Sequence, residues 1–224
     1  MLCVKPIKFD HNATRKSFFW GCTHTYHDPH WPIPLWRMRG YSSVEEHAQG
    51  IKEKINSTCS TTDTLFLLGD GFLTSSPEQV EEFLLGLNPQ IQYIWGNHES
   101  SITRLYRKYR DTLYGQSIVL SENTEIYPLK WKNLTFWGNY LEININGQCL
   151  VLSHYPFKVF NNSKQNYFAL HSHCHNSLAS SSIDAQEGKI LDVGVDAFLD
   201  GPVSFDKIKE IMNKKPNKSF DKHH

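Results

Sequence analysis

The sequence predicts an α/β fold in which two mixed β-sheets pack face to face and helices flank them. Three observations support this prediction. Strand–helix–strand units dominate the first half of the chain, the second half is rich in hairpins, and no internal repeat or long linker divides the 224 residues. A chain of this length can bury one large core. We therefore expect a single domain over residues 1–224, with loose termini at 1–16 and 214–224.

In the first half, short apolar runs alternate with helical patterns. Ser43 and Ser76 each stand three residues before a Glu or Gln, which is the capping-box signature of a helix start. Between the first strand and the first helix, the segment 28–40 holds three prolines and is expected to be a loop. The predicted strands are 18–22, 64–68 and 91–95, and the predicted helices start after Ser43, after Ser76 and near Ile102.

The second half shows the two-residue period of half-buried strands. Asn146-Gly147 separates two such runs and is a strong signal for a two-residue hairpin turn. Ser204 is expected to cap a final helix. The predicted strands are 126–129, 134–137, 140–145, 148–152, 168–170 and 190–193.

Composition narrows the partners that we expect. The formal net charge is zero and no polybasic run is visible, so neither a nucleic-acid surface nor a membrane surface is expected as a partner. No apolar run has the length of a membrane span or of a signal peptide. The five cysteines form no disulfide framework, which favours a reducing compartment, and we expect a cytoplasmic protein.

Side chains that can bind metals follow the predicted strands at several points. Imidazole nitrogens, a carboxylate and an amide oxygen suit divalent ions such as those of Mn, Fe, Zn or Ni. They are too many for one ion, but they suit two ions that share a bridging carboxylate, an arrangement that activates water and clamps a phosphoryl group. The candidate ligands are Cys22, His24, Asp70, Asn97, His154, His173 and His175.

Each candidate also has an ordinary structural interpretation. Asp70 could be a turn residue, His98 a residue at a helix start, and His154 the end of a strand. His173 and His175 alternate along the chain and would share a face by chance in many extended segments. The order of all the motifs, each after a predicted strand, favours a metal centre over these alternatives.

The order and spacing of these motifs resemble the calcineurin-like metallophosphoesterases, in particular small single-domain bacterial and phage members, over nearly the whole chain. That family reads Asp-x-His, Gly-Asp, Gly-Asn-His-Asp/Glu, a lone His and Gly-His-x-His. The corresponding stretches here are Cys22-Thr23-His24, Gly69-Asp70, Gly96-Asn97-His98-Glu99, His154 and Ser172-His173-Cys174-His175. The resemblance implies a four-layer α/β/β/α sandwich, and the cytoplasm of a bacterium or of a phage-infected host cell.

The resemblance also implies a role for each matching residue. Asp70 would bridge two ions. His98 would act as general acid or charge stabiliser for the leaving oxygen while a metal-activated hydroxide attacks phosphorus, and Glu99 would orient a site histidine. The first ion would be completed by Cys22, His24 and His175, and the second by Asn97, His154 and His173.

Two departures from the family pattern leave alternatives open. Ser172 replaces a Gly, which is tolerable if the backbone there has no positive φ. Cys22 replaces an Asp ligand: a thiolate would bias the site toward Zn²⁺, whereas a neutral thiol would leave that site weak or empty. The chain is therefore expected to be either a phosphoesterase or a catalytically impaired relative that binds a protein or nucleotide.

The substrate is expected to be a small-molecule or nucleotide phosphate ester, and the sequence does not choose between a monoester and a diester or fix the oligomeric state. Arg39 could contact a substrate phosphate, because guanidinium groups suit phosphate, although a solvated loop position is the alternative. His27 is close enough to His24 in sequence to line the same cleft.

Overall fold

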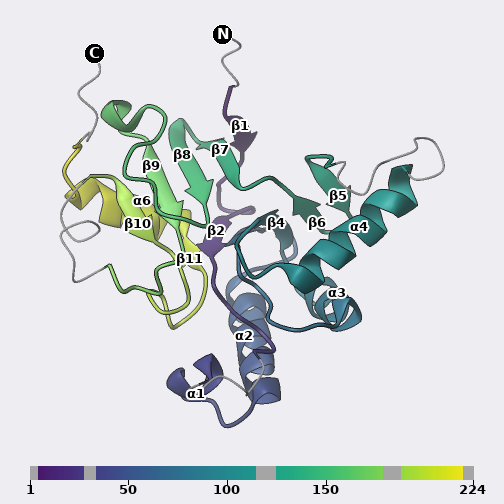
Figure 1. Cartoon of the computed structure of the whole chain (residues 1–224). Coiled ribbons are helices and arrows are strands. Elements are labelled where there is room, and N and C mark those ends of the chain that lie inside the picture. The colour runs from purple at the N-terminus through teal and green to yellow at the C-terminus, as the bar shows by residue number, and fades with distance from the viewer. Residues whose placement is uncertain (1–4, 28–33, 115–124, 179–187, 219–224) are drawn as a thin grey trace.

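Two β-sheets form the centre of the computed structural model, which describes residues 5–27, 34–114, 125–178 and 188–218 (Figure 1). The first sheet has the order β1 (Ile7–Phe9), β7 (Tyr140–Ile145), β8 (Gln148–Ser153), β9 (Phe168–His171) and β10 (Ile190–Asp192). The second has the order β11 (Val203–Ser204), β2 (Ser17–Trp20), β3 (Thr64–Leu68), β4 (Gln90–Ile94), β6 (Leu134–Phe136) and β5 (Leu129–Trp131). Both sheets contain parallel and antiparallel pairs, so the predicted α/β fold with two mixed sheets is confirmed.

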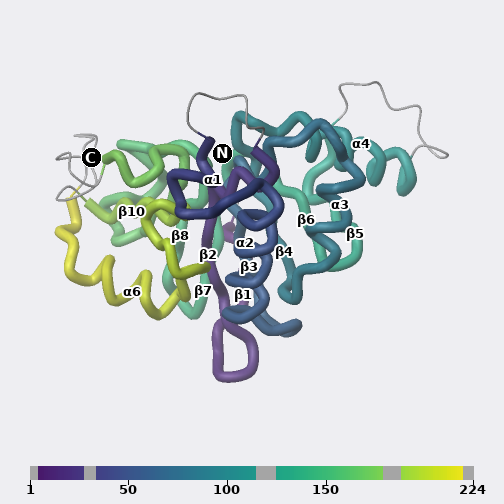
Figure 2. Tube along the Cα trace, turned by 90° about the horizontal axis from the view of Figure 1, so that it is seen from below, coloured from purple at the N-terminus to yellow at the C-terminus, as the bar shows by residue number. Residues whose placement is uncertain are grey.

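Helices cover the outer face of the second sheet. They are α2 (Val44–Thr58), α3 (Pro77–Leu85) and α4 (Ser100–Tyr114). Seen after a 90° turn, β8 and β10 of the first sheet lie on one side of β2 and β3, and α3 and α4 lie on the other (Figure 2). The Ser43 side chain accepts a hydrogen bond from Glu46 N, and Ser76 accepts one from Gln79 N, so the predicted helix caps are confirmed.

The central strands are buried on both faces, which explains their continuous apolar runs. In β2, Phe18 and Trp20 belong to the core under the helices, whereas Phe19 faces the core between the sheets. Phe66 of β3 stacks on Phe19 in that second core, with ring centroids 4.9 Å apart. At the Asn146-Gly147 turn both residues have positive φ, 50° and 87°, as a two-residue hairpin of this kind requires.

Several expectations are wrong in detail. Residues 1–16 are not loose throughout, because Ile7–Phe9 pairs with Ile143–Ile145 as an edge strand. The expected loop over 28–40 contains a short helix, α1 (Leu35–Met38), while 28–33 lie outside the described residues. The strand predicted at 126–129 starts only at Leu129, because Pro128 has no N–H to donate to a sheet.

The helix at the C-terminal end, α6 (Phe205–Lys214), is capped by Ser204 as predicted. Its residues Phe205, Ile208 and Met212 join the core between the two sheets. The outer face of the first sheet instead carries a small apolar cluster of Val151, Ala169 and Ile190. Phe160 and Tyr167, on either side of the 3-10 turn η1 (Ser163–Gln165), pack against this cluster. Among the described residues, a helical layer over that face is therefore not seen.

The parallel strands β2, β3 and β4 end at one edge of the second sheet. Parallel β8 and β9 of the first sheet deliver their own carboxyl ends to the same region, because Ser172, just after β9, donates a hydrogen bond to Leu68 O at the end of β3. Ligand sites in α/β folds lie at such edges.

Candidate metal centre

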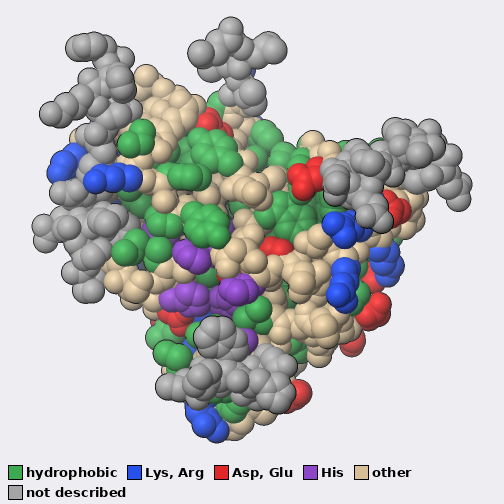
Figure 3. Space-filling model, in the orientation of Figure 1, with side chains coloured by type: hydrophobic (Ala, Val, Ile, Leu, Met, Phe, Trp, Pro, Cys, Tyr) green, Lys and Arg blue, Asp and Glu red, His purple; other side chains and the backbone are tan. Residues whose placement is uncertain are grey.

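All seven candidate ligands lie together at this edge. Histidine side chains gather at the middle of one face of the molecule, and hydrophobic side chains lie next to them (Figure 3). The group draws on the ends of five strands, each of which supplies at least one side chain. Cys22 and His24 follow β2, Asp70 follows β3, Asn97 follows β4, His154 follows β8, and His173 and His175 follow β9.

One half of the cluster converges on His154 Nε2. This atom lies 2.9 Å from Asn97 Oδ1, 3.0 Å from His173 Nδ1 and 3.3 Å from Asp70 Oδ2. The other ring nitrogen, Nδ1, lies 3.0 Å from Leu68 O, which can only accept, so we assign the proton to Nδ1. In neutral His154 the Nε2 lone pair then faces two oxygen atoms. A cation between these atoms would stabilise the arrangement, and a metal ion is one that fits.

The other half of the cluster pairs His24 with His175. Their Nε2 atoms lie 3.2 Å apart, and His24 Nε2 lies 3.9 Å from Asp70 Oδ2. His175 donates its Nδ1–H to Asp196 Oδ2 at 2.6 Å, which leaves its Nε2 lone pair directed at His24. The donor atoms of Cys22, His24 and His175 all lie within 4.8 Å of one another, as ligands around one cation would.

Asp70 stands between the two halves. Its Oδ1 accepts hydrogen bonds from the backbone N–H groups of Asn97 and His98, both at 2.8 Å, and its Oδ2 faces both histidine groups. Burial alone would raise the pKa of this carboxyl, but hydrogen bonding to His154 and to the backbone, together with the nearby imidazoles, holds it well below its usual range. Asp70 is thus held as an anion at the centre of the cluster.

The backbone is strained where the candidate ligands attach. Cys22, His24, Asp70 and His175 have φ values of 50°, 46°, 51° and 48°. Non-glycine residues seldom adopt this left-handed conformation, and it costs on the order of 1 kcal/mol or more at each position. Strain of this kind clusters at functional sites, because it aims side chains that ordinary turns would not bring together.

Glycines make the close packing of these loops possible. A side chain at Gly69, where φ is 75°, would meet the backbone of Gly96 at 2.7 Å, and one at Gly96 would meet Asp70 Oδ1. The Gly-Asp and Gly-Asn-His motifs are therefore in direct contact.

Glu99 was expected to orient a site histidine. It instead holds the backbone of this corner. Its Oε1 accepts hydrogen bonds from Asp70 N and Gly96 N, both at 2.8 Å, and its Oε2 accepts one from Tyr93 Oη at 2.8 Å. Burial raises the pKa of Glu99 to about 7. The residue that Glu99 positions is Asp70.

Arg39 takes neither of the two expected positions, because its side chain is neither solvated nor free to meet a substrate phosphate. Its side chain is 3% exposed and forms a two-pronged ion pair with Asp196, at 2.9 Å from Nε and 2.8 Å from NH2. It also donates to the carbonyl oxygens of Cys22 and Thr23. Arg39 therefore fixes the strained turn that carries Cys22 and His24.

Asp196 is a site residue that sequence reasoning missed. It links Arg39 to His175, and both interactions keep the pKa of its carboxyl well below the usual range although burial opposes this. Its position after a short apolar strand, like that of the other site residues, was the signal that could have found it.

Cys22 and Ser172, the two departures from the family pattern, touch each other. Ser172 donates its hydroxyl proton to Leu68 O at 2.5 Å, so its oxygen can accept the S–H of Cys22, whose Sγ lies 3.4 Å away. Burial raises the pKa of the Cys22 thiol well above its ordinary value, which the Ser172 contact only partly offsets. Without a bound cation the side chain is therefore a thiol. Ser172 itself has no positive φ, so the backbone tolerates the replacement of Gly.

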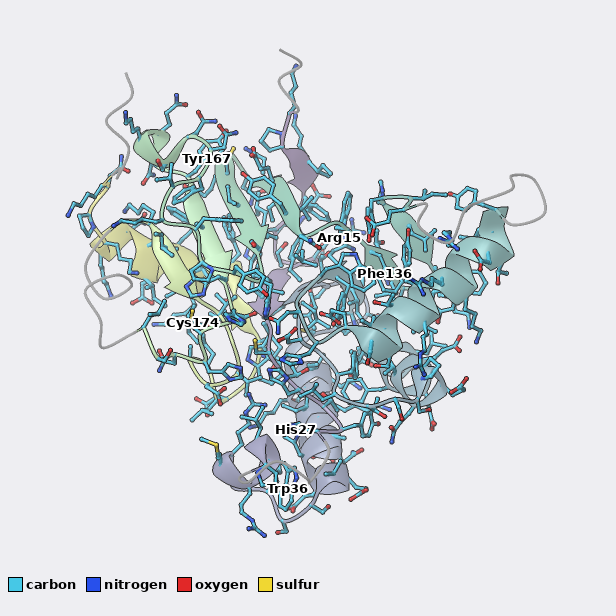
Figure 4. The ribbon with its side chains drawn as sticks, viewed as in Figure 1. Arg15, His27, Trp36, Phe136, Tyr167 and Cys174 are labelled. Carbon is cyan, nitrogen blue, oxygen red and sulfur yellow. The ribbon has the colours of Figure 1, made fainter. Side chains whose placement is uncertain are left out.

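His98 and His27 line one cavity with His24. The cavity has a volume of about 480 Å³, and the His98 ring centroid lies 5.9 Å from that of His24. The His27 ring lies 6.5 Å from His24, and His27 Nδ1 is 3.3 Å from Leu35 N, which places it between the strand ends and α1 (Figure 4). His27 thus lines the same cavity as His24, and a contact of His27 with substrate stays a prediction.

Comparison with known proteins supports the fold alone. No protein-family model matches the chain, and no curated protein matches its sequence. The crystal structure of AQ665, a protein of unknown function from Aquifex aeolicus, superimposes with a TM-score of 0.59 at 17% identity, covering 88% of this chain and 99% of that one. Within the described residues, no helix is both long enough and apolar enough to cross a membrane.

Proposed function

We propose that the protein is a metal-dependent phosphoesterase built on the metallophosphoesterase arrangement of two packed sheets, and that it hydrolyses a phosphomonoester or phosphodiester. The observation that carries the proposal is the position of Asp70 Oδ2, 3.3 Å from His154 Nε2 and 3.9 Å from His24 Nε2, with a set of donors on either side. A carboxylate shared by two cations requires this arrangement.

Two divalent ions, of Mn, Fe, Zn or Ni, fit the donor atoms. Asp70, Asn97, His154 and His173 would hold one of them, and Asp70, His24 and His175, with Cys22 near them, would hold the other. When bound, the ions would supply an activated water and positive charge for the phosphoryl oxygens.

The chain's own residues would act on the leaving group and on the ligands. His98 is exposed beside the cluster and can give a proton to the leaving oxygen. His154 and His175 are fixed in one tautomer by Leu68 O and Asp196, so each presents Nε2 to the centre.

Metal analysis combined with hydrolysis tests the proposal. The protein loaded with each ion should hydrolyse generic phosphomonoester or phosphodiester substrates. His98→Ala should lower kcat by about 100-fold or more while the metal content stays the same, because His98 is assigned to proton transfer and not to ligation. Metal-loaded wild type without turnover in any of the ions would contradict the proposal.

A second candidate function is a binding module on the same scaffold. The contact of the Cys22 thiol with Ser172 favours it, because a neutral thiol weakens the first metal site. The variant Cys22→Asp distinguishes the phosphoesterase from the binding module. If activity appears only in the variant, the natural protein is a binding module. If the natural protein is already active and the variant only changes its metal preference, the protein is an enzyme.

A further inference from the structure

The cavity beside His98 has an unusual lining for a site that would handle phosphate esters. Its walls combine the imidazoles of His24, His98 and His175 with three apolar side chains, Leu35, Met38 and Leu73. Its volume of about 480 Å³ lies in the range of small-ligand sites. The cavity therefore has room for more than the phosphoryl group that the metal centre would hold.

The apolar wall is partly open to solvent. Met38 in α1 is 69% exposed although it borders the candidate metal centre. An exposed large apolar side chain gains free energy when an apolar ligand removes its surface from water. Leu35 and Leu73 line the same cavity and are half-buried, and an apolar patch beside a functional site marks a ligand surface.

Charge in the cavity disfavours an anionic occupant. None of the described lining residues is Lys or Arg. The guanidinium of Arg39 behind the wall is already bound by Asp196, and its side chain is only 3% exposed. The Asp196 carboxylate lines the cavity and is already paired with Arg39, so a second phosphate or carboxylate would gain no cationic partner from this pair.

We propose that this cavity binds the apolar substituent of the substrate, so that the protein acts on phosphoesters of aryl or branched alkyl alcohols in preference to those of highly charged ones. The inference rests on the proposed function, because the adjoining metal centre is taken to hold the phosphoryl group. Leu35, Met38 and Leu73 are then specificity-determining residues that contact the carbon skeleton of the ester.

Binding of two phosphonates to metal-loaded protein tests this without turnover. Phenylphosphonate and methylphosphonate present the same anionic group and differ in the apolar substituent. Isothermal titration calorimetry should give at least about tenfold tighter binding of phenylphosphonate, since the ring buries more apolar surface. Equal affinities would overturn the cavity assignment and leave the phosphoesterase proposal standing, whereas no binding of either compound to protein with bound metal would overturn both.

A pair of surface variants locates the effect. Met38→Gln should remove much of the preference for phenylphosphonate and leave methylphosphonate binding unchanged. Leu113→Gln is the matched control, because Leu113 on α4 is a 45% exposed apolar residue outside the cavity. The assignment would be overturned if both variants lost the preference for phenylphosphonate equally, or if neither variant lost it. Both positions are exposed, so both variants are expected to fold.

Discussion

At the scale of single residues, the candidate site depends on the residues that hydrogen-bond to the candidate ligands as much as on the ligands themselves. Asp196 fixes the tautomer of His175 and neutralises Arg39, which in turn holds the carbonyls of Cys22 and Thr23. One carboxylate thus controls the turn that follows β2 and the histidine that follows β9. Such partners of metal-binding histidines tune affinity without touching the ion.

Replacement of this carboxylate tests that role. Asp196→Asn should weaken binding of one of two ions by about 10- to 100-fold, because the amide is a poorer acceptor for the His175 N–H. Titration of metal-free protein with Zn²⁺ or Mn²⁺ measures the loss. Asp200→Asn, an exposed neighbour, is the control and should bind as wild type does. Unchanged affinity in the Asp196 variant would contradict the role.

His47 should make the protein less stable in acid. Its side chain is fully buried, and burial together with the nearby Arg39 lowers its pKa to about 3. Below about pH 6.5 the unfolded chain binds a proton at this position while the folded chain does not, so folding stability falls as the pH drops toward 3.

The expected size of this effect is about 2 kcal/mol between pH 7 and pH 5. Urea unfolding of wild type and His47→Gln at pH 7 and pH 5 measures this change in unfolding free energy. The difference between the two proteins separates the effect of His47 from that of the histidines of the site. Parallel pH dependences for the two proteins would refute the assignment.

At the scale of elements, the helices are set by local signals that the sequence makes visible. Ser43 caps α2, which packs Ala48, Ile51 and Ile55 into the core over the second sheet.

Loss of this cap should lower stability. Ser43→Ala removes the acceptor for Glu46 N and should cost about 1 kcal/mol of unfolding free energy. Ser42→Ala is the control, because Ser42 reaches Glu46 through its backbone N–H. Chemical denaturation measures both, and equal effects would show that the cap is not the cause.

At the scale of the whole molecule, the candidate centre joins the two sheets. Asp70 and Asn97 extend from the second sheet, and His154 and His173 extend from the first. Bound ions would therefore cross-link two layers that otherwise meet through the apolar core between them.

Removal of metal should lower the melting temperature. At an ion concentration of 100 times Kd, binding adds about 2.7 kcal/mol to stability, which corresponds to roughly 5–10 °C for a chain of this size. Thermal unfolding with and without chelator measures the shift. Asp70→Asn should show little response to the chelator, and an equal shift in this variant would contradict the assigned centre.

The elements were largely predictable because their signals are local. The capped helices after Ser43 and Ser76 and the Asn146-Gly147 turn depend on residues a few positions apart, and all three are confirmed. The edge strand Ile7–Phe9 was missed because its stability comes from pairing with β7, more than 130 residues away in sequence. A pattern within three residues does not reveal such a partner.

The sequence by itself determined the two-sheet α/β architecture and the set of side chains that gather at the strand ends. It could do so because periodicity and caps are local, and because parallel strands place their carboxyl ends together. Only the tertiary structure decided that Glu99 holds Asp70, that Arg39 is bound to Asp196 and that Cys22 meets Ser172. These contacts join residues up to 157 positions apart, and their geometry follows from how the two sheets pack.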